Sequence, residues 1–497
     1  MDIDVGDLSL QLKDKALFKQ KCFIGGKWEE ADNGEKFEVI NPSNSSVVGT
    51  MPNVGKNETI KAIEAANNAW PAWKSLTGKE RSIIIRRWHD LILENIDDLA
   101  MIMTLENGKP IPDSRGEIVY ASWFVDWFAE EAKRTYGKTI PETMPGRKIL
   151  TIKQPIGVCA IITPWNFPAA MITRKVAPAL AAGCTVVIKP AGSTPFSATA
   201  LAELADRAGV PKGVINIISV SEENVQEVGD EICSNSKVRK LSFTGSTAVG
   251  KVLTAKAAST VKKVSMELGG NAPFIVFEDA DLDEAVEGAM ANKYRNSGQV
   301  CVSANRIFVQ EKIYDVFATK FAERSAALKV ADGREDGSQM GPLITMAAME
   351  KVQTHITDAI DKGANVITGG SVHNAGKQFF QPTVMTNVTS KMRIFNEETF
   401  GPVAPLIKFS NEEEVIKMAN DTNYGLAGYF YSRDIGKIWR VAEELEFGMV
   451  AINAGILSNE VAPFGGIKES GIGREGASEG IDEYLETKYL LIAGIDS

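Results

Sequence analysis

Two hydrophobic patterns alternate along most of this sequence. In residues 57–72 and 78–95 apolar side chains recur at helical spacing, so each segment predicts an amphipathic helix. Short apolar runs rich in β-branched residues are instead typical of strands buried on both faces of a parallel sheet. Such runs occupy 156–163, 184–189, 214–219 and 239–244, with helical patterns at 170–183 and 195–209 between the first three. This alternation predicts a doubly wound α/β domain.

A second α/β series begins near residue 270. The run 273–277 predicts a strand, and 281–296 predicts a helix that Asp281 opens. Further strands are predicted at 305–310 and 364–367. We therefore expect two doubly wound α/β domains that meet near the glycine pair at 269–270. The expected bounds are 10–136 with 158–269 for the first domain, and 270–469 for the second.

Two remaining segments have the pattern of exposed β structure. Residues 137–157 combine Pro, Gly and alternating polar and apolar residues, as an exposed hairpin does, and the apolar run within 484–497 predicts a late strand. Exposed strand edges often pair with another chain. We expect these segments to form a small β element that assembles a homodimer or homotetramer. Packing within one chain is the alternative.

The size and charge of the chain limit its domain count and its partners. The chain has 497 residues, whereas a single core rarely grows past about 250–300 residues, so two large domains are expected. A net charge of −10 argues against nucleic acid or an anionic membrane as a partner. The sequence contains no apolar run long enough to span a membrane, and its first residues lack the apolar run of a secretory signal. We expect a cytoplasmic protein.

The cysteines and histidines exclude several kinds of site. Five cysteines, an odd and sparse set, do not form a disulfide framework, and no pair has the spacing of a zinc site. The three histidines lie far apart in the sequence, without metal-ligand spacing. We expect no metal, and we expect any general base to be a carboxylate.

Three residues are candidates for nucleophilic chemistry. Cys301, in NSGQVCVSANR, follows a glycine-led loop that suits a reactive thiol, although most free cysteines are small buried hydrophobic residues. Glu267, in MELGGN, could accept a proton from that thiol or from water if the two faced each other; otherwise it is a turn residue. Asn166, in TPWNFP, follows a strand and could donate to an oxyanion, or it could cap a turn between two prolines.

Two further motifs suit a phosphate-bearing ligand. Lys189 ends a predicted strand and could bind ribose hydroxyls or phosphate. Residues 243–250 (FTGSTAVG) form a glycine-bearing loop between a strand and a helix, where main-chain N–H groups favour a phosphate. This loop is not the common GxGxxG motif, so by itself it is weak evidence.

Taken together, the motifs resemble one family. TPWNFP, IKPA, FTGS, ELGGN, GQVC, EETFGP and PFGG occur in this order over nearly the whole chain, which resembles the aldehyde dehydrogenase superfamily. The resemblance implies that Cys301 attacks the aldehyde, that Asn166 and the Cys301 N–H bind the oxyanion, and that Glu267 activates the water that hydrolyses a thioester. It also implies that 10–136 and 158–269 bind NAD or NADP and that 270–469 are catalytic.

The same resemblance assigns cofactor contacts. Lys189 and Glu398 would bind ribose, Ser246 the pyrophosphate, and Trp165 and Phe400 would line the site. The full set of expected cofactor-binding residues is Thr163, Trp165, Lys189, Gly192, Ser193, Gly245, Ser246, Glu398 and Phe400.

Within the superfamily, the chain most resembles the succinate-semialdehyde dehydrogenases. The supporting stretches are PWNFPAAMITRK, GGNAPFIVFEDADLDEA, the Arg six residues before the nucleophile and SNEVAPFGGIKESGIGREG. They imply that Arg174, Arg295 and Ser458 bind a distal carboxylate, as an Arg fork can, and that Phe464 lines the aldehyde funnel. Two alternatives remain open: Arg174 pairs with a structural acid, or Asn459 replaces Ser458.

The substrate also has alternatives. Succinate semialdehyde is expected first, but glutarate or 2-oxoglutarate semialdehyde differs by one or two methylenes, which are worth only about 1–3 kcal/mol. Transfer of the acyl group to coenzyme A is a third alternative, which Glu267 disfavours because a base beside the thioester favours attack by water. A catalytically silent protein on this scaffold is the last alternative.

Two departures from the family pattern matter. Ser303 stands where many relatives have a second Cys, so no disulfide can protect the nucleophile there. Gly192 stands where NAD-preferring relatives often have Glu. Because a Glu would repel a 2′-phosphate, we expect NADP to be accepted; a preference for NADP over NAD is left open.

Overall fold

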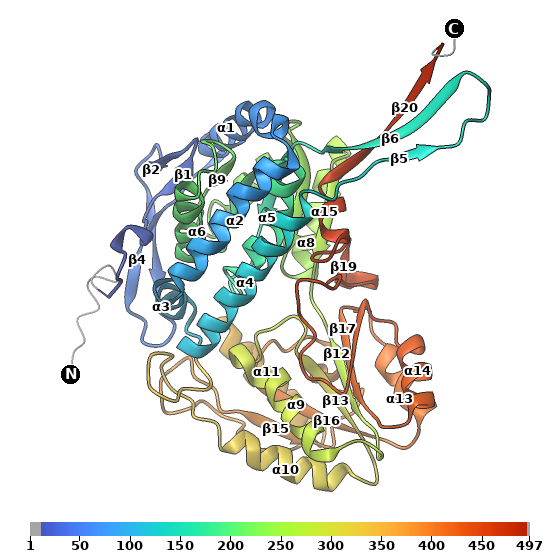
Figure 1. Cartoon of the computed structure of the whole chain (residues 1–497). Helices are drawn as coiled ribbons and strands as arrows, with labels where there is room; N and C mark the ends of the chain where they lie inside the picture. The colour runs from blue at the N-terminus through green and yellow to red at the C-terminus, as the bar shows by residue number, and fades with distance from the viewer. Residues whose placement is uncertain (1–10, 495–497) are drawn as a thin grey trace.

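Figure 1 shows the computed structural model, which describes residues 11–494, as two α/β lobes and a thin projecting β arm. The N-terminal lobe contains an eight-stranded sheet of order β19-β11-β10-β7-β8-β9-β1-β2. Its five central strands are parallel, whereas β1 and β19 join antiparallel at the two sides. The strand bounds are β1 Cys22–Ile24, β2 Lys27–Glu29, β7 Val158–Ile162, β8 Thr185–Lys189, β9 Ile215–Ile217, β10 Val238–Thr244, β11 Lys263–Glu267 and β19 Gly471–Ile472.

Helices cover both faces of this sheet. The strand β7 is buried throughout, and its residues alternate between two cores. Cys159 and Ile161 belong to the core beneath α2 to α6, whereas Ala160 belongs to the core with α1, α7 and α8. The helix bounds are α1 Lys56–Ser75, α2 Gly78–Glu94, α3 Ile96–Asn107, α4 Ile111–Glu131, α5 Ala170–Ala182, α6 Phe196–Arg207, α7 Val225–Ser234 and α8 Thr247–Ala257.

The second lobe repeats this architecture around a seven-stranded sheet of order β14-β15-β16-β13-β12-β17-β18. All its pairings are parallel except β14 with β15. The strands are β12 Ala272–Val276, β13 Ala304–Gln310, β14 Asn365–Thr368, β15 Thr383–Thr386, β16 Val403–Phe409, β17 Ala427–Tyr431 and β18 Met449–Ile452; the helices are α9 Leu282–Tyr294, α10 Tyr314–Ala326, α11 Met346–Asp361, α12 Arg393–Asn396, α13 Glu412–Asn420 and α14 Ile435–Glu444.

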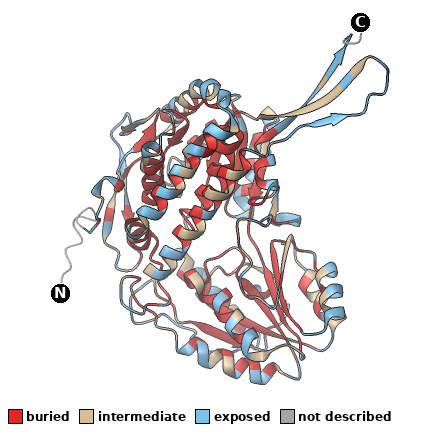
Figure 2. Ribbon diagram, in the orientation of Figure 1, coloured by how far each residue is buried: buried red, intermediate tan, exposed pale blue. Residues whose placement is uncertain are grey.

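The arm is a three-stranded sheet of order β20-β6-β5. The late strand β20 (Leu485–Ala493) pairs antiparallel with β6 (Arg147–Pro155) along its whole length, and β5 (Lys138–Ile140) pairs with the other edge of β6. Figure 2 shows that burial is concentrated in the two lobes, whereas the strands of the arm, apart from the buried Leu485, are exposed or of intermediate burial. Tyr489 and Leu491 on β20 are exposed apolar residues. A second small sheet, β3 (Lys36–Ile40) with β4 (Val47–Pro52), lies at the N-terminal side of the chain.

The predicted fold class, with two doubly wound α/β units, is confirmed. The helix expected at 281–296 begins as predicted, with the Asp281 side chain capping it, but ends at Tyr294. Asn296 and Ser297 then adopt left-handed conformations with φ of 48° and 57°. The expected start at residue 10 and the last three residues of 484–497 lie outside the described residues. Within residues 11–494 no helix is both long and apolar enough to cross a membrane.

Candidate active site

Cys301 lies in the turn between the kinked end of α9 and β13. It is partly exposed, whereas the other four cysteines are buried. A Cβ on Gly270 would lie 2.4 Å from the Cys301 carbonyl oxygen, so only glycine lets the 267–271 loop pack this closely. Burial raises the pKa of Cys301 to about 12, and the Arg174 charge opposes that shift. The thiol is therefore protonated at neutral pH and needs a base.

Glu267 is the last residue of β11 and is 4% exposed. Its Oε2 has no hydrogen-bond partner among the described residues. Burial raises the pKa of Glu267 well above the ordinary glutamate range, and the Glu475 carboxylate raises it further. Glu267 also affects the charge balance at Cys301, so the two groups share one site. A carboxyl group with a raised pKa suits proton transfer near neutral pH.

Asn166 lies between β7 and α5 and is buried. Its Nδ2 donates to the carbonyl of Gln299, two residues before the nucleophile, at 3.0 Å. Its own carbonyl accepts hydrogen bonds from Lys109 at 2.7 Å and from Asn296 at 3.0 Å. The Asn side chain is thus tied to the loop that carries Cys301, with one amide N–H left for an incoming oxygen.

Lys189 is the last residue of β8, and Thr163 directly follows the neighbouring parallel strand β7. The Thr163 N–H donates a hydrogen bond to the Lys189 carbonyl at 3.2 Å. The Lys189 ammonium has no hydrogen bond or ion pair within residues 11–494, and burial lowers its pKa to about 8. The Thr163 hydroxyl is likewise without a partner there. A cation and a hydroxyl left unpaired in this way suit a hydroxyl-rich or anionic ligand.

Other expected cofactor contacts lie around the same strand ends. Ser246 caps α8, and its side chain accepts a hydrogen bond from Val249 N at 3.4 Å. The free N–H groups at the start of a helix favour a phosphate. The preceding Gly245 donates its N–H to the Glu267 carbonyl at 3.0 Å. Gly192, followed by Ser193, packs closely, since a Cβ there would lie 3.1 Å from the Val220 oxygen.

Three expected cofactor contacts remain, of which Glu398 and Phe400 come from the second lobe. Glu398 is half-buried, and its Oε1 accepts a hydrogen bond from Gly270 N at 3.0 Å. Phe400 meets Trp165 of the first lobe edge to face, with ring centroids 5.7 Å apart. The Lys189 ammonium, the N–H groups at the start of α8 and the Glu398 carboxylate supply donors and acceptors that fit a dinucleotide.

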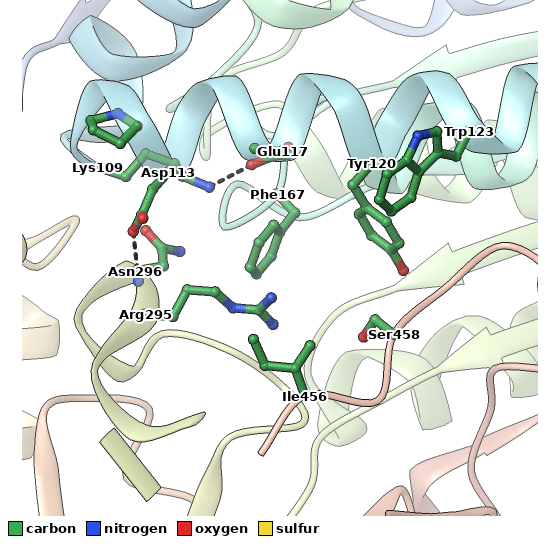
Figure 3. A pocket seen from close by; sticks show the side chains of 12 residues that line it. Lys109, Asp113, Glu117, Tyr120, Trp123, Phe167, Arg295, Asn296, Ile456 and Ser458 are labelled. Atoms are coloured by element: carbon green, nitrogen blue, oxygen red, sulfur yellow. Dashed lines mark hydrogen bonds and ion pairs between the residues drawn. The ribbon is translucent and has the colours of Figure 1, made fainter. Parts of the chain in front are cut away.

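A cavity of about 260 Å³ adjoins this centre. Figure 3 shows Arg295 and Ser458 facing it from two segments, with the Tyr120 hydroxyl directed towards Ser458 from α4. The Arg295 guanidinium lies 5.4 Å from the Phe167 ring, and its Nε has no hydrogen-bond partner among the described residues. Neighbouring Asn459 caps its own turn by accepting from Val461 N and Ala462 N. Ser458, not Asn459, is the residue that lines the cavity.

Arg174 does not line that cavity. It is 1% exposed and forms an ion pair with Glu475, with Nη2 and Oε2 2.8 Å apart. Lys175 pairs with the same carboxylate. The guanidinium also stacks over Phe464, 3.8 Å from the ring centroid. Glu475 is therefore the structural acid of the alternative interpretation of Arg174. The Nε of Arg174 still has no hydrogen-bond partner within residues 11–494.

Sequence reasoning missed several members of this site. Glu475, Lys175, Lys109 and Tyr120 were assigned no role, although Glu475 stands in GREG and Lys175 directly follows Arg174. Their importance comes from contacts that span long separations, such as 300 residues between Lys175 and Glu475. No local pattern indicates such a pair.

Comparison with known proteins identifies the family. Residues 28–490 match the aldehyde dehydrogenase family. The chain belongs to this family. Its members use NAD(P)+ as the electron acceptor.

Individual relatives refine the type of dehydrogenase. The chain is 58% identical to the glutarate-semialdehyde dehydrogenase of Pseudomonas putida over 484 residues, covering 97% of this chain and 100% of that protein. It is 57% identical to the NADP(+) succinate-semialdehyde dehydrogenase of Escherichia coli, with 97% and 100% covered. A crystal structure of succinate-semialdehyde dehydrogenase from Burkholderia pseudomallei matches with a TM-score of 0.96 at 58% identity, with 97% and 100% covered. The protein is an aldehyde dehydrogenase of the semialdehyde-dehydrogenase type.

Proposed function

We propose that the enzyme oxidises a short aldehyde with a distal carboxylate, succinate semialdehyde first, to the dicarboxylate. The observation that carries this proposal is the cavity in which Arg295 and Ser458 face the same space, together with the electrostatic effect of the Arg295 charge on the Cys301 thiol. An unpaired guanidinium there would bind a carboxylate and disfavour neutral aldehydes, which would leave it without a partner. The two relatives named above are both semialdehyde dehydrogenases whose substrates carry such a group.

Glutarate semialdehyde is the second candidate, because the Pseudomonas putida relative is named for it. The two aldehydes differ by one methylene, so the pocket separates them by only about 1–3 kcal/mol. Arg174, through its free Nε, is proposed as a further cation for the substrate carboxylate, in addition to its ion pair with Glu475. Phe464 would line the path of the aldehyde beneath Arg174.

In the proposed mechanism Glu267 takes the proton of Cys301 and releases it to solvent, and the thiolate sulfur attacks the aldehyde carbon. The Asn166 amide and the Cys301 N–H stabilise the oxyanion of the resulting thiohemiacetal. Bound NAD(P)+ supplies the two-electron acceptor that allows a thioester to form. Glu267 then takes a proton from water, which attacks the thioester and releases the acid and the free thiol.

Cofactor binding is proposed for the N-terminal lobe, within residues 10–136 and 158–269. Lys189 and Glu398 would hold ribose, Ser246 with Gly245 the pyrophosphate, and Thr163, Trp165 and Phe400 the surrounding walls. Gly192 and Ser193 carry no carboxylate that would repel a 2′-phosphate, so NADP is accepted, and the substrate panel below compares its kcat/KM with that of NAD. The NADP(+) designation of the Escherichia coli relative supports the acceptance of NADP.

The remaining assignments concern domains and assembly. Residues 270–469 would carry catalysis, and 137–157 with 484–497 would join subunits into a dimer or tetramer. The exposed edge and apolar side chains of β20 support this role for the arm.

A substrate panel tests the proposed function. Succinate, glutarate and 2-oxoglutarate semialdehydes and neutral aldehydes of similar length are assayed with NAD and with NADP, and coenzyme A is added to detect an acyl-CoA product. We expect the highest kcat/KM for a carboxylate-bearing aldehyde, turnover with NADP, and a free acid as product. Cys301→Ala must abolish turnover. Equal rates for neutral aldehydes, or turnover by the Cys301→Ala variant, would contradict the proposal.

A further inference from the structure

The turn that carries Asn166 is held from behind by side chains at the end of α3. Asn107 Nδ2 donates to the carbonyl of Trp165 at 2.9 Å, and Lys109 Nζ donates to the next carbonyl, that of Asn166, at 2.7 Å. Both donors are buried, at 1% and 2% exposure. Two successive peptide groups of the turn are therefore fixed by side chains that do not touch the reacting atoms.

Lys109 is itself held in place by Glu117 of α4. Its Nζ lies 2.5 Å from Glu117 Oε2 and 4.2 Å from the Phe167 ring centroid. The other carboxylate oxygen, Oε1, accepts from Ala169 N at 2.9 Å and from Ala170 N at 3.2 Å, at the start of α5. Figure 3 shows the Lys109–Glu117 pair beside the cavity. This ion pair thus links both ends of the segment between Asn166 and α5.

Asn296 holds the same carbonyl from the opposite side. Its Nδ2 donates to Asn166 O at 3.0 Å, and its backbone adopts the left-handed φ of 48° described above. Such a conformation is uncommon for a residue with a Cβ and is tolerated best by Gly and Asn. Asn166 O therefore accepts two hydrogen bonds, one from the α3–α4 region and one from the loop that carries Cys301.

Stability alone is a weak reason for a buried ion pair here. Burial lowers the pKa of Lys109, since an ammonium loses its hydration there. Replacing a buried ion pair with apolar residues of similar volume is often neutral or stabilising. A rigid support for a group that must donate to a developing oxyanion is a stronger reason, because a displacement of about 1 Å can cost roughly 100-fold in rate.

We propose that Lys109, held by Glu117, is a positioning residue that fixes the main chain at Asn166 so that the Asn166 amide meets the oxyanion. This inference rests on the proposed function, in which Asn166 donates to the thiohemiacetal oxygen. Lys109 also lines the cavity, where its ammonium is paired with Glu117, and its effect on the oxyanion is transmitted through Asn166. Its removal therefore changes catalysis without changing the chemistry of the Cys301 sulfur itself.

The test compares Lys109→Met with a matched control, Lys262→Met. Lys262 is also buried and its ammonium also donates to two main-chain carbonyls, those of Ile232 and Asn235, but it lies away from Asn166. We expect Lys109→Met to lower kcat for the preferred semialdehyde by about 10- to 100-fold. Its KM and its cofactor Kd should stay within about threefold of wild type, and Lys262→Met should keep wild-type kcat.

A double-mutant cycle with Asn166→Ala separates positioning from general damage. If Lys109 works through Asn166, then Lys109→Met in the Asn166→Ala background lowers kcat no further. Alkylation of Cys301 by iodoacetamide, located by peptide mapping, should proceed at the wild-type rate in Lys109→Met, because that reaction forms no oxyanion. Wild-type kcat in Lys109→Met, multiplicative losses in the double variant, or an equal loss in Lys262→Met would overturn the proposal.

A second variant guards against misfolding. Asn296→Gly removes the other donor to Asn166 O while glycine accepts the left-handed backbone. It should reproduce the loss of kcat and the non-additivity with Asn166→Ala, and failure to do so counts against positioning. Turnover by Cys301→Ala, or wild-type kcat in Asn166→Ala, would instead refute the proposed mechanism. Lowered kcat in Asn166→Ala together with wild-type kcat in Lys109→Met and Asn296→Gly would refute the positioning role alone.

Discussion

Replacing Arg295 by Met tests carboxylate recognition with little risk to the fold. Among the described residues the Arg295 side chain makes no hydrogen bond and no ion pair, and its guanidinium lies over the Phe167 ring, 5.4 Å from the ring centroid. Removing the guanidinium therefore breaks no ion pair, although it also removes a positive charge that opposes the rise that burial causes in the pKa of Asp113. Met keeps much of the apolar stem that packs in the cavity.

The expected loss follows from the bond to the substrate. A hydrogen bond to a charged group contributes about 1.5–3 kcal/mol, which corresponds to roughly a 10- to 150-fold decrease in kcat/KM. This decrease should apply to succinate and glutarate semialdehydes. For pentanal, which has no carboxylate, kcat/KM of Arg295→Met should equal or exceed that of wild type. In wild type, a bound pentanal would strip water from the Arg295 guanidinium and offer it no new partner, and this cost is absent in the variant.

The assay is initial NADPH formation over a range of aldehyde concentrations, for each substrate, with both proteins. Ser458→Ala should give a smaller selective loss, about 2- to 13-fold, as expected for a hydrogen bond of about 0.5–1.5 kcal/mol. Arg324→Met, which removes an exposed Arg paired with Glu287, serves as the control. If Arg295→Met lowers kcat/KM equally for pentanal and for the semialdehydes, or for neither, the carboxylate assignment is wrong.

Three further predictions concern the base and the cofactor site. Burial and Glu475 raise the pKa of Glu267, and a base acts only when it is deprotonated. We therefore expect kcat to fall as the pH drops through a value above 4.5, and we expect Glu267→Gln to abolish turnover. Gly192→Glu should lower the ratio of kcat/KM for NADP over NAD by about tenfold or more, because its carboxylate repels the 2′-phosphate. Gly192→Ala, which adds only the crowding against the Val220 oxygen, should leave this ratio unchanged. Burial lowers the pKa of Lys189 to about 8 in the folded chain. The unfolded chain then binds more protons between about pH 8 and 10.4, so stability rises with pH there. Lys189→Met should raise Tm at pH 7, lose that gain towards pH 10 and weaken cofactor binding; an unchanged Tm at pH 7 would contradict this.

The sequence by itself determined the layered architecture. Continuous apolar runs such as 158–162 can be buried only between two layers of helices, so the periodicities located the central parallel strands. Functional groups at the ends of such strands share one edge of a sheet. For that reason local motifs identified Cys301, Glu267, Asn166 and Lys189 as candidates before any contact was known.

Only the tertiary structure decided how these groups are paired and supported. The short strand β19 joins the first sheet from far along the chain, and its two residues carry no periodic signal. Arg174 could bind substrate or a structural acid, and the answer depends on Glu475, which lies 301 positions later. The support of Asn166 by Lys109 likewise spans 57 residues. Side-chain pairing across such separations is set by how the packed elements meet in space, and no local pattern of apolar and polar residues records it.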